Sequence, residues 1–393
     1  RIIAKYNKHN KKGNETMNIL LDAMGGDNAP DANIKGALKA VNQIKATITL
    51  VGKEEVIRNK VKEFTEKEIE EVLNKYKLTE DEHKKYYEVI KRLWTADQYP
   101  VENPIAVIIG GQTGAGKSGL ISYSQKMFPD NNVVIINSDE IKPFHPYGEE
   151  IAKKYPELYT KVTDQESNTW TSKLFEDVRN EKYNLIFEGT MKNNRIADEA
   201  IPILQGLGYT VVVRGLAVSG LESRLSIHER YEGQVKHKGW GRLVVPEHHN
   251  QTFNGMPNTI EYIEQNGRYD VLEIYTRGKT PDMPVLKYAN HNKNTIEKTS
   301  QVLKNKKFIT KESQKNNYMN AKDSILKVRE ENEEQIIDDC KERFAAIINS
   351  MNDRHASKSE KEQLFELLEL YNNTNEKVKK KDYMNKIVDD KEK

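Results

Sequence analysis

The amino-acid sequence predicts an α/β fold in which a mostly parallel sheet is flanked by helices and followed by a helical C-terminal extension. Two observations predict it. Between residues 104 and 278, short apolar runs alternate with helical patterns, which is the order of elements in a parallel sheet with crossover helices. The first run, 105–109, leads directly into a glycine-rich loop and then into residues that can start a helix.

That loop has the spacing of a phosphate-binding P-loop. Its residues are Gly111, Gln112, Thr113, Gly114, Ala115, Gly116, Lys117 and Ser118. Glycines let backbone N–H groups turn inward around an anion, and the following helix adds the positive end of its dipole. Lys117 is expected to reach the β- and γ-phosphates of ATP, and the Ser118 hydroxyl to ligate Mg²⁺. The alternative, a glycine-rich turn with a chance Lys-Ser pair, is disfavoured by the preceding strand.

Polar residues follow two of the other expected strands. Those strands are 133–136, 184–187, 210–217 and 271–276. Asp139 comes after the first of them, and Glu188 and Thr190 come after the second. Because the carboxyl ends of parallel strands border the ligand crevice, these side chains are expected beside the bound substrate. Asp139 can accept the proton of a substrate hydroxyl, although such a residue can also simply cap the next helix.

Two arginines follow the strand at 210–217. Arg230 lies on the next predicted helix, and Arg242 lies in a glycine-flanked loop that can close as a lid. Guanidinium groups neutralise the charge that builds up on a transferred phosphoryl group. Either arginine alone would more often be a surface ion pair, but together and after a P-loop they indicate phosphoryl transfer. The neighbouring pair His248-His249 has no further ligand at zinc spacing, so we expect no zinc site there.

Residues 65–278 resemble the zeta toxins of toxin–antitoxin systems, which are P-loop kinases of UDP-N-acetylglucosamine. The motifs that carry the resemblance are Gly-Gly-Gln-Thr-Gly-Ala-Gly-Lys-Ser (110–118), Asn-Ser-Asp-Glu-Ile-Lys-Pro-Phe-His-Pro (137–146), Tyr-Asn-Leu-Ile-Phe-Glu-Gly-Thr (183–190), Glu-Arg-Tyr-Glu (229–232) and Gly-Arg-Leu-Val-Val-Pro-Glu-His-His (241–249). The sequence departs from the family at Thr113, where proline is common, and near Ser172, where a family glutamate is replaced.

The resemblance implies ATP-dependent phosphorylation of the sugar 3′-hydroxyl of UDP-N-acetylglucosamine by the toxin of such a system. It implies Asp139 as the base, with Lys117 and Ser118 serving ATP and Mg²⁺. Glu188 and Thr190 would then face the sugar nucleotide, and Arg230 and Arg242 would contact the moving phosphate. A cognate antitoxin would be the protein partner.

Two other functions stay open. The same fold can phosphorylate a different hydroxyl acceptor, such as another sugar, a nucleoside or an antibiotic. The second alternative is a protein that binds a nucleotide without catalysing a reaction. The presence of Asp139, Arg230 and Arg242 argues against this alternative.

The N-terminal region carries a second resemblance. Residues 1–16 are polar and without period, and we expect them to be disordered. Residues 17–62 form a predicted β-α-β unit that resembles the start of the phosphate acyltransferase of bacterial phospholipid synthesis, through Asp-Ala-Met-Gly-Gly-Asp-Asn-Ala-Pro at 22–30. No continuation is recognised after residue 62, so we expect a truncated segment without acyl transfer. Residues 65–94 are expected to be helical, with capping boxes at Thr65 and Thr79.

The remaining expectations concern organisation and setting. The predicted segments are 1–16, 17–62, a kinase domain at 63–279, and a linker with helices at 280–393. Sixty-two basic against 60 acidic residues give a net charge of +2, so no nucleic-acid partner is expected, and the basic end near Lys377 is interpreted as a solvated helix terminus. No apolar run approaches the roughly 18–20 residues of a membrane span. The single cysteine, Cys340, favours a reducing compartment, and the cytoplasm is predicted.

Overall fold

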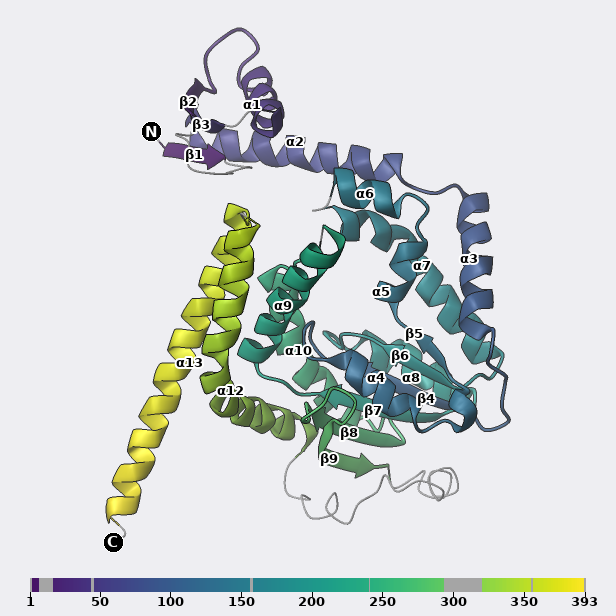
Figure 1. Ribbon diagram of the computed structural model, residues 1–393. Helices are drawn as coiled ribbons and strands as arrows, with labels where there is room; N and C mark the ends of the chain where they lie inside the picture. Colours follow the sequence, from purple (N-terminus) through teal and green to yellow (C-terminus); the bar gives the residue numbers. More distant parts are fainter. Residues whose placement is uncertain are drawn as a thin grey trace.

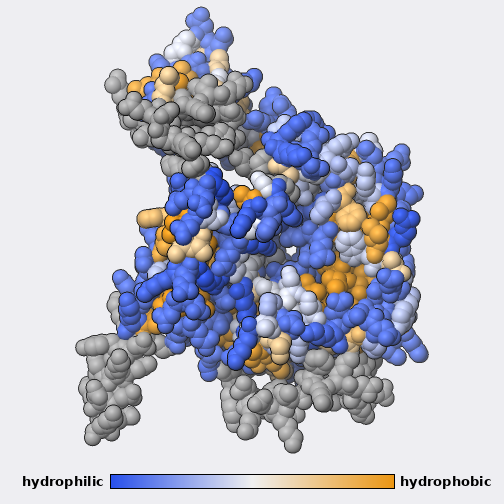
Figure 2. All heavy atoms as spheres, in the orientation of Figure 1, coloured by the Kyte–Doolittle hydropathy of each residue, from blue (hydrophilic) through white to orange (hydrophobic). Residues whose placement is uncertain are grey.

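The computed structural model describes residues 2–6, 17–43, 46–155, 158–239, 241–292, 320–354 and 356–391. Its centre is an α/β body, with a small N-terminal sheet at one end and two long C-terminal helices along one side (Figure 1). The visible surface is mostly hydrophilic, and its apolar side chains form small separate patches (Figure 2). No helix in the described ranges is both long and apolar enough to cross a bilayer.

The central sheet has six strands in the order β5-β6-β4-β7-β8-β9. The strands are β4 (Ile105–Gly110), β5 (Val134–Ile136), β6 (Leu185–Glu188), β7 (Thr210–Leu216), β8 (Val271–Thr276) and β9 (Val285–His291). All neighbouring pairs are parallel except β8 and β9. The predicted α/β fold and its five strands are therefore confirmed, and the antiparallel edge strand β9 is an addition to them.

Helices cover both faces of this sheet. They are α3 (Glu80–Thr95), α4 (Lys117–Gln125), α5 (Ser138–Ile141), α6 (Gly148–Lys154), α7 (Tyr159–Asn180), α8 (Ile201–Gly206), α9 (Gly220–Lys238) and α10 (Pro246–Gln265). Short helical turns lie at Pro129–Asn131, Lys142–Phe144 and Ile196–Ala200. Because successive side chains of a strand point to opposite faces, Ala106 and Ile108 join one buried cluster with Trp170, while Val107 and Ile109 join the other with α4.

The N-terminal unit has a three-stranded sheet in the order β1-β3-β2. Its elements are β1 (Ile2–Tyr6), β2 (Met17–Asp22), α1 (Asp31–Gln43), β3 (Ala46–Gly52) and the first half of α2 (Glu54–Lys75). Strands β2 and β3 are parallel, so the β-α-β prediction is confirmed. The prediction of disorder is wrong for residues 2–6, because β1 pairs with β3 in antiparallel fashion. Residues 1 and 7–16 lie outside the described ranges.

Helix α2 connects this unit to the α/β body. It is continuous from Glu54 to Lys75, so the boundary expected between residues 62 and 63 falls inside one helix. The capping box expected at Thr65 is wrong, since Thr65 is in the middle of α2, whereas the one at Thr79 is confirmed as the start of α3. The two ends of α2 belong to different cores: Ile57 packs in the N-terminal unit, and Val72 packs with residues of α6 and α7.

The C-terminal extension is helical, as predicted, and consists of α12 (Ala321–Asp353) and α13 (Lys358–Lys391). Both helices lie beside α9 (Figure 1). The apolar stripe of α12, which includes Cys340 and Phe344, packs with Leu221 and Leu225 of α9 and with α13. The sequence between residues 291 and 320 is rich in Lys and Asn and weakly patterned, and residues 293–319 lie outside the described ranges.

Candidate active site

The P-loop connects β4 to α4 at the carboxyl end of the sheet. Gly114 and Gly116 have φ angles of +80° and +98°, in the left-handed region that favours glycine. A Cβ atom at Gly114 would lie 2.1 Å from the backbone oxygen of Ser223, so that position has no room for a side chain. The loop therefore has the tight, inward-turned backbone that an anion site at a helix N-terminus requires.

The side chains of Lys117, in the P-loop, and Glu188, at the end of β6, form an ion pair. The Lys117 Nζ lies 3.4 Å from Glu188 Oε1, and it also donates to the backbone oxygen of Gln112 over 3.3 Å. Asn137 donates to the other Glu188 oxygen over 2.6 Å. Burial raises the pKa of Glu188, although the Lys117 charge opposes that rise. The ends of β4, β5 and β6 thus bring the P-loop lysine and a predicted substrate-binding carboxylate together.

Asp139 is held between two cations. Its Oδ1 accepts from Arg242 Nη1 and from Lys142 Nζ, each over 2.7 Å, and Lys142 is also 2.8 Å from Asp164. Burial alone would raise the pKa of Asp139, but the charges of Arg242 and Lys142 outweigh it and leave that pKa below its ordinary value. The side chain remains 53% exposed, so its carboxylate is open to a ligand.

The alternative that Asp139 is only a helix cap is wrong. The N-cap of α5 is Asn137, whose Oδ1 accepts from the Asp139 backbone N–H over 2.8 Å. The Asp139 carboxylate is therefore free of any capping role and bonds to Arg242 and Lys142 instead.

Arg230 projects from α9 into the same region. Its side chain is exposed, and in the part of the chain that the structure describes it makes no hydrogen bond or ion pair. Neighbouring groups of the site partly desolvate the guanidinium, and this desolvation and the nearby Arg242 charge lower the pKa of Arg230, while Asp139 and Glu188 act in the opposite direction. Arg230 thus lies among the other predicted catalytic groups, and its guanidinium N–H groups have no hydrogen-bond partner among the described residues.

The remaining predicted residues take up different positions. The backbone N–H of Arg242 donates to Gln234 of α9 over 2.9 Å, and this bond holds Arg242 beside α9. Thr190 is half-buried two residues beyond Glu188, and Ser118 is exposed in the first turn of α4. Trp240 lies outside the described residues. The structure therefore brings Lys117, Glu188, Asp139 and Arg242 into contacting pairs, and leaves Ser118 open to solvent.

The side chain of Gln112 is held by hydrogen bonds to neighbouring elements of the fold. Its Nε2 donates to the Val218 backbone oxygen over 2.8 Å and lies 3.3 Å from Ser223 Oγ, and its Oε1 accepts from Arg329 of α12 over 3.4 Å. Ser223 is in turn 2.8 Å from His249 Nε2. Gln112 is fully buried, so within the P-loop it has only its backbone to offer a nucleotide.

Sequence reasoning missed two residues of this site. Arg277 donates to the backbone oxygens of Gly114 and Ala115, the latter over 2.9 Å, and bonds to Glu222 over 2.9 Å. It follows β8 directly, so the same rule of strand carboxyl ends that selected Asp139 would have found it. Lys142 lies three residues after Asp139 on the same helical path, which is the spacing at which helical side chains pair.

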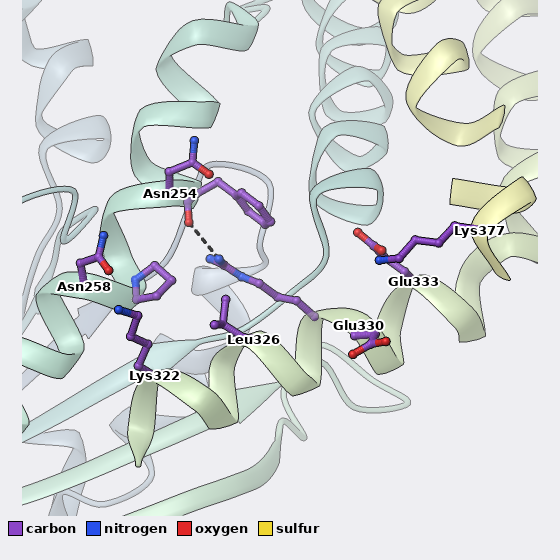
Figure 3. Close-up of a pocket in the computed structure, with 10 residues that line it drawn as sticks. Asn254, Asn258, Lys322, Leu326, Glu330, Glu333 and Lys377 are labelled. Atoms are coloured by element: carbon purple, nitrogen blue, oxygen red, sulfur yellow. Dashed lines mark hydrogen bonds between the residues drawn. The ribbon is translucent and has the colours of Figure 1, made fainter. Parts of the chain in front are cut away.

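One cavity lies away from the P-loop. It has a volume of about 390 Å³ and lies between α10, α12 and α13, where Asn254, Leu326 and Lys377 are among its lining residues (Figure 3). Arg329 lines it too, and donates to the Phe253 backbone oxygen over 2.9 Å. The P-loop contributes no residue to this cavity.

The residues present fit a nucleotide with a bound Mg²⁺. Among the described residues there is no group of three His, Cys, Asp or Glu side chains that could hold a metal by themselves. Mg²⁺ in nucleotide sites usually keeps several waters and takes few protein ligands together with phosphate oxygens. The exposed Ser118 hydroxyl, next to the positive end of α4, suits that arrangement.

The fold and this site define a P-loop kinase fold, and comparisons with known proteins match its central domain to a known family. The zeta toxin family profile matches residues 91–284, and a profile described as fatty acid synthesis protein matches residues 17–118. Residues 91–284 are a zeta toxin domain, preceded by a phosphate acyltransferase-like segment. The second match runs past the end predicted at residue 62 and overlaps the P-loop, so the expectation that nothing continues it was wrong.

Individual relatives agree with both assignments. Toxin zeta of Streptococcus agalactiae is 29% identical over 218 residues, which cover 55% of this chain and 71% of that protein. Phosphate acyltransferase of Dictyoglomus turgidum is 34% identical over 116 residues, and this chain spans about a third (34%) of its length. A solved structure from the PezAT chromosomal toxin–antitoxin system of Streptococcus pneumoniae superposes with a TM-score of 0.55 at 21% identity, covering 70% of this chain and 98% of that chain, which shows a shared fold.

Proposed function

We propose that the zeta toxin domain is an ATP-dependent kinase that phosphorylates the 3′-hydroxyl of UDP-N-acetylglucosamine and acts as the toxin of a toxin–antitoxin system. The observation that carries this proposal is the placement of Asp139, bonded to Arg242, beside a P-loop whose Lys117 pairs with Glu188. A purely nucleotide-binding module has no need of an open carboxylate and an unengaged arginine at that edge. The similarity to Toxin zeta supports a toxin role, and the resemblance of the sequence motifs to the zeta toxins suggests the acceptor.

On the nucleotide side, the P-loop backbone of residues 111–116 and the N-terminus of α4 would bind the phosphates, with Lys117 as the bridging cation and Ser118 as a Mg²⁺ ligand. Bound ATP with Mg²⁺ supplies the transferable γ-phosphoryl group. Arg277 would keep the loop in shape, because it bonds to two of its backbone oxygens. Lys117 already has partners in the free protein, so its side chain is held in the site in advance.

On the acceptor side, Asp139 would receive the hydroxyl proton. Its depressed pKa keeps it ionised near neutral pH, and phosphoryl transfer through a loose transition state makes little demand on base strength. Arg242 contacts this carboxylate, and Arg230 stands close by, so both guanidinium groups would border the transferred group. Glu188 and Thr190 would bind hydroxyl or amide groups of the sugar nucleotide.

We also propose an antitoxin partner and a cytoplasmic location. The partner is proposed from the solved structure of the PezAT system, with which the fold is shared. The location follows from the substrate, since UDP-sugar and ATP are both cytoplasmic metabolites, and from a single cysteine that is buried. No acyl transfer is proposed for the N-terminal segment.

The test is incubation of the pure protein with ATP, Mg²⁺ and a panel of sugar nucleotides, nucleosides and aminoglycosides, followed by mass spectrometry. The expected result is one added phosphoryl group on UDP-N-acetylglucosamine, and none in the Lys117→Ala variant, which lacks the bridging cation. Phosphorylation of a different panel member would replace the proposed acceptor. Absence of product from the whole panel, with ATP bound, would favour the non-catalytic module.

A further inference from the structure

We propose that the C-terminal helices α12 and α13 are a positioning element of the kinase site, because they hold α9 in the rotation that points Arg230 at the substrates. Arg343 and Arg354 are the positioning residues. This inference rests on the proposed function in so far as Arg230 serves phosphoryl transfer. It gives the C-terminal extension a part in the reaction, although none of its residues touches the P-loop backbone or Asp139 in the described contacts.

The first connection is a two-point ion pair between α12 and α9. Arg343 donates from Nε to Glu229 Oε1 over 2.6 Å and from Nη2 to Glu229 Oε2 over 2.7 Å. The same Nη2 reaches Ser226 Oγ over 3.2 Å. A bidentate guanidinium–carboxylate pair fixes orientation as well as distance. Glu229 immediately precedes Arg230, so this pair controls the direction in which Arg230 leaves the helix.

The second connection lies one helical turn further on. Arg354 donates from Nε to Glu232 Oε2 over 2.8 Å and from Nη2 to Glu232 Oε1 over 2.5 Å. Ser350 adds a hydrogen bond to the same carboxylate over 2.6 Å. Glu232 is buried, so it would stay uncompensated if Arg354 were removed. Arg354 also bonds to Glu360 at the start of α13, over 2.8 Å, and this joins both C-terminal helices to the contact.

The geometry of α9 turns these contacts into a constraint on Arg230. Residues 229 and 232 are three positions apart and share one helix face, whereas Arg230 lies about 100° around the helix from Glu229 and leaves from a different face. Tyr231 adds a third tether, since its hydroxyl donates to Glu360 over 2.6 Å. Leu221 and Leu225, earlier on α9, pack into the apolar core of α12 and α13. One face of α9 is therefore fixed by the extension, and the exposed Arg230 is left to face the site.

The experiment compares two ion pairs of α12 in the full-length protein. Arg343→Gln breaks the pair with Glu229, whereas Lys322→Gln breaks a pair of 2.9 Å with Glu261 on α10, away from Arg230. Side-chain exposure is similar in the two pairs, 23% and 39% against 30% and 31%, so the second is a matched control. We measure kcat and KM with ATP and UDP-N-acetylglucosamine, ATP affinity, thermal stability, and hydrogen exchange of the α9 amides.

A misplaced catalytic group can cost on the order of 10²-fold in rate, so we expect Arg343→Gln to lower kcat by about 10–100-fold while ATP affinity is kept. Glu229→Gln should have the same effect, and the double variant should be no slower than either single variant, because both changes remove one shared contact. Lys322→Gln should leave kcat unchanged. Hydrogen exchange of residues 220–238 should accelerate in Arg343→Gln and not in Lys322→Gln.

Unchanged kcat in a folded Arg343→Gln variant would overturn the inference, as would an equal loss in Lys322→Gln. If Arg343→Gln fails to fold, the milder Glu229→Gln variant decides between the same outcomes. If the wild-type protein phosphorylates no acceptor, the proposed function fails. Exchange of the α9 amides then still decides the positioning claim: acceleration confined to the Arg343–Glu229 variants supports it, and equal exchange in all variants refutes it.

Discussion

At the scale of single residues, Asp139 combines an open carboxylate with two cationic neighbours, and we propose that it acts as the catalytic base. Asp139→Asn keeps shape and hydrogen bonding but removes the proton acceptor. General-base catalysis contributes about 10²–10⁴-fold, so kcat should fall by that order while ATP binding persists. The measurement is the initial rate against both substrates, with ATP affinity determined in parallel.

Two controls sharpen this result. Asn137→Ala removes the actual cap of α5 and should cost stability on the order of 1 kcal/mol with a smaller loss of rate. Raising the Mg²⁺ concentration should not rescue Asp139→Asn, because partial rescue would identify a metal-ligand role instead. A variant that turns over at the wild-type rate would remove the base assignment.

Glu188 should set the acid limit of activity. Burial raises its pKa above the ordinary 4.5, whereas the pKa of Asp139 lies below 3.8, so Glu188 is the first of the two to gain a proton as the pH falls. We expect kcat/KM to decline on the acid side at a pH above 4.5, and to recover as the pH rises through the Glu188 pKa. Glu188→Gln should lower the rate and abolish this limb, which a pH–rate profile from pH 4.5 to 8 would reveal. An unchanged limb in that variant would assign it to another group.

At the scale of elements, the N-terminal unit should be dispensable for catalysis. The buried residues of its core are Ala23, Ile34, Ala37, Ile48, Leu50, Ile57 and Val61, all of which precede residue 63. The chain that remains after deletion of residues 1–62 keeps Val72 of α2 and the following Tyr76, which pack with Ile151 and Val162. We therefore expect kcat within error of the full chain and a similar melting temperature for the α/β body. A deletion variant that fails to fold would show that the two cores depend on each other.

The elements also show where sequence reasoning worked. The strands of the parallel sheet are continuous apolar runs, because such strands are buried on both faces, and all five were predicted. Strand β9 was missed because it is an edge strand that pairs only with β8. Lys287 and Asn290 interrupt its apolar residues, so it is not a continuous apolar run. Thr65 was mistaken for a helix start because the pattern Thr-x-x-Glu also occurs inside helices. Whether the pattern caps a helix depends on whether the residues before it are already helical, and here α2 begins at Glu54.

The site was predictable to the extent that it follows local rules. The P-loop spacing and the residues after β5 and β6 are fixed by chain order, and the structure places Lys117 against Glu188 as those rules suggest. The contacts of Arg329 with Gln112 and of Arg343 with Glu229 join residues 217 and 114 positions apart. No periodicity or motif encodes such a pairing, because it depends on how α12 packs after the whole sheet has formed.

At the scale of the whole molecule, two buried histidines should make stability depend on pH. His228 is 4% exposed and His249 is 1% exposed, and burial lowers the pKa of each to about 4, from an ordinary 6.5. Between pH 6.5 and 4 the unfolded chain binds protons that the folded chain does not, so stability is lost as the pH falls through that window. Each histidine would contribute on the order of 3 kcal/mol to this loss.

Urea unfolding at a series of pH values checks this dependence. His249→Gln should flatten the decline between pH 6.5 and 4, at some cost in stability at pH 7 because the contact with Ser223 changes. His237→Gln, an exposed position on the same helix as His228, is the matched control and should leave the decline as it is. An identical decline in all three proteins would assign the pH dependence to carboxylates instead.

We propose that this domain moves a phosphoryl group from ATP to the 3′-hydroxyl of UDP-N-acetylglucosamine. The most direct measurement incubates the full-length protein with ATP and Mg²⁺ and either UDP-N-acetylglucosamine or its 3′-deoxy analogue, then locates the phosphate by phosphorus and proton NMR. We expect a 3′-phosphorylated product from the natural sugar nucleotide and none from the analogue. Phosphate on another position, or equal phosphorylation of the analogue, would contradict it.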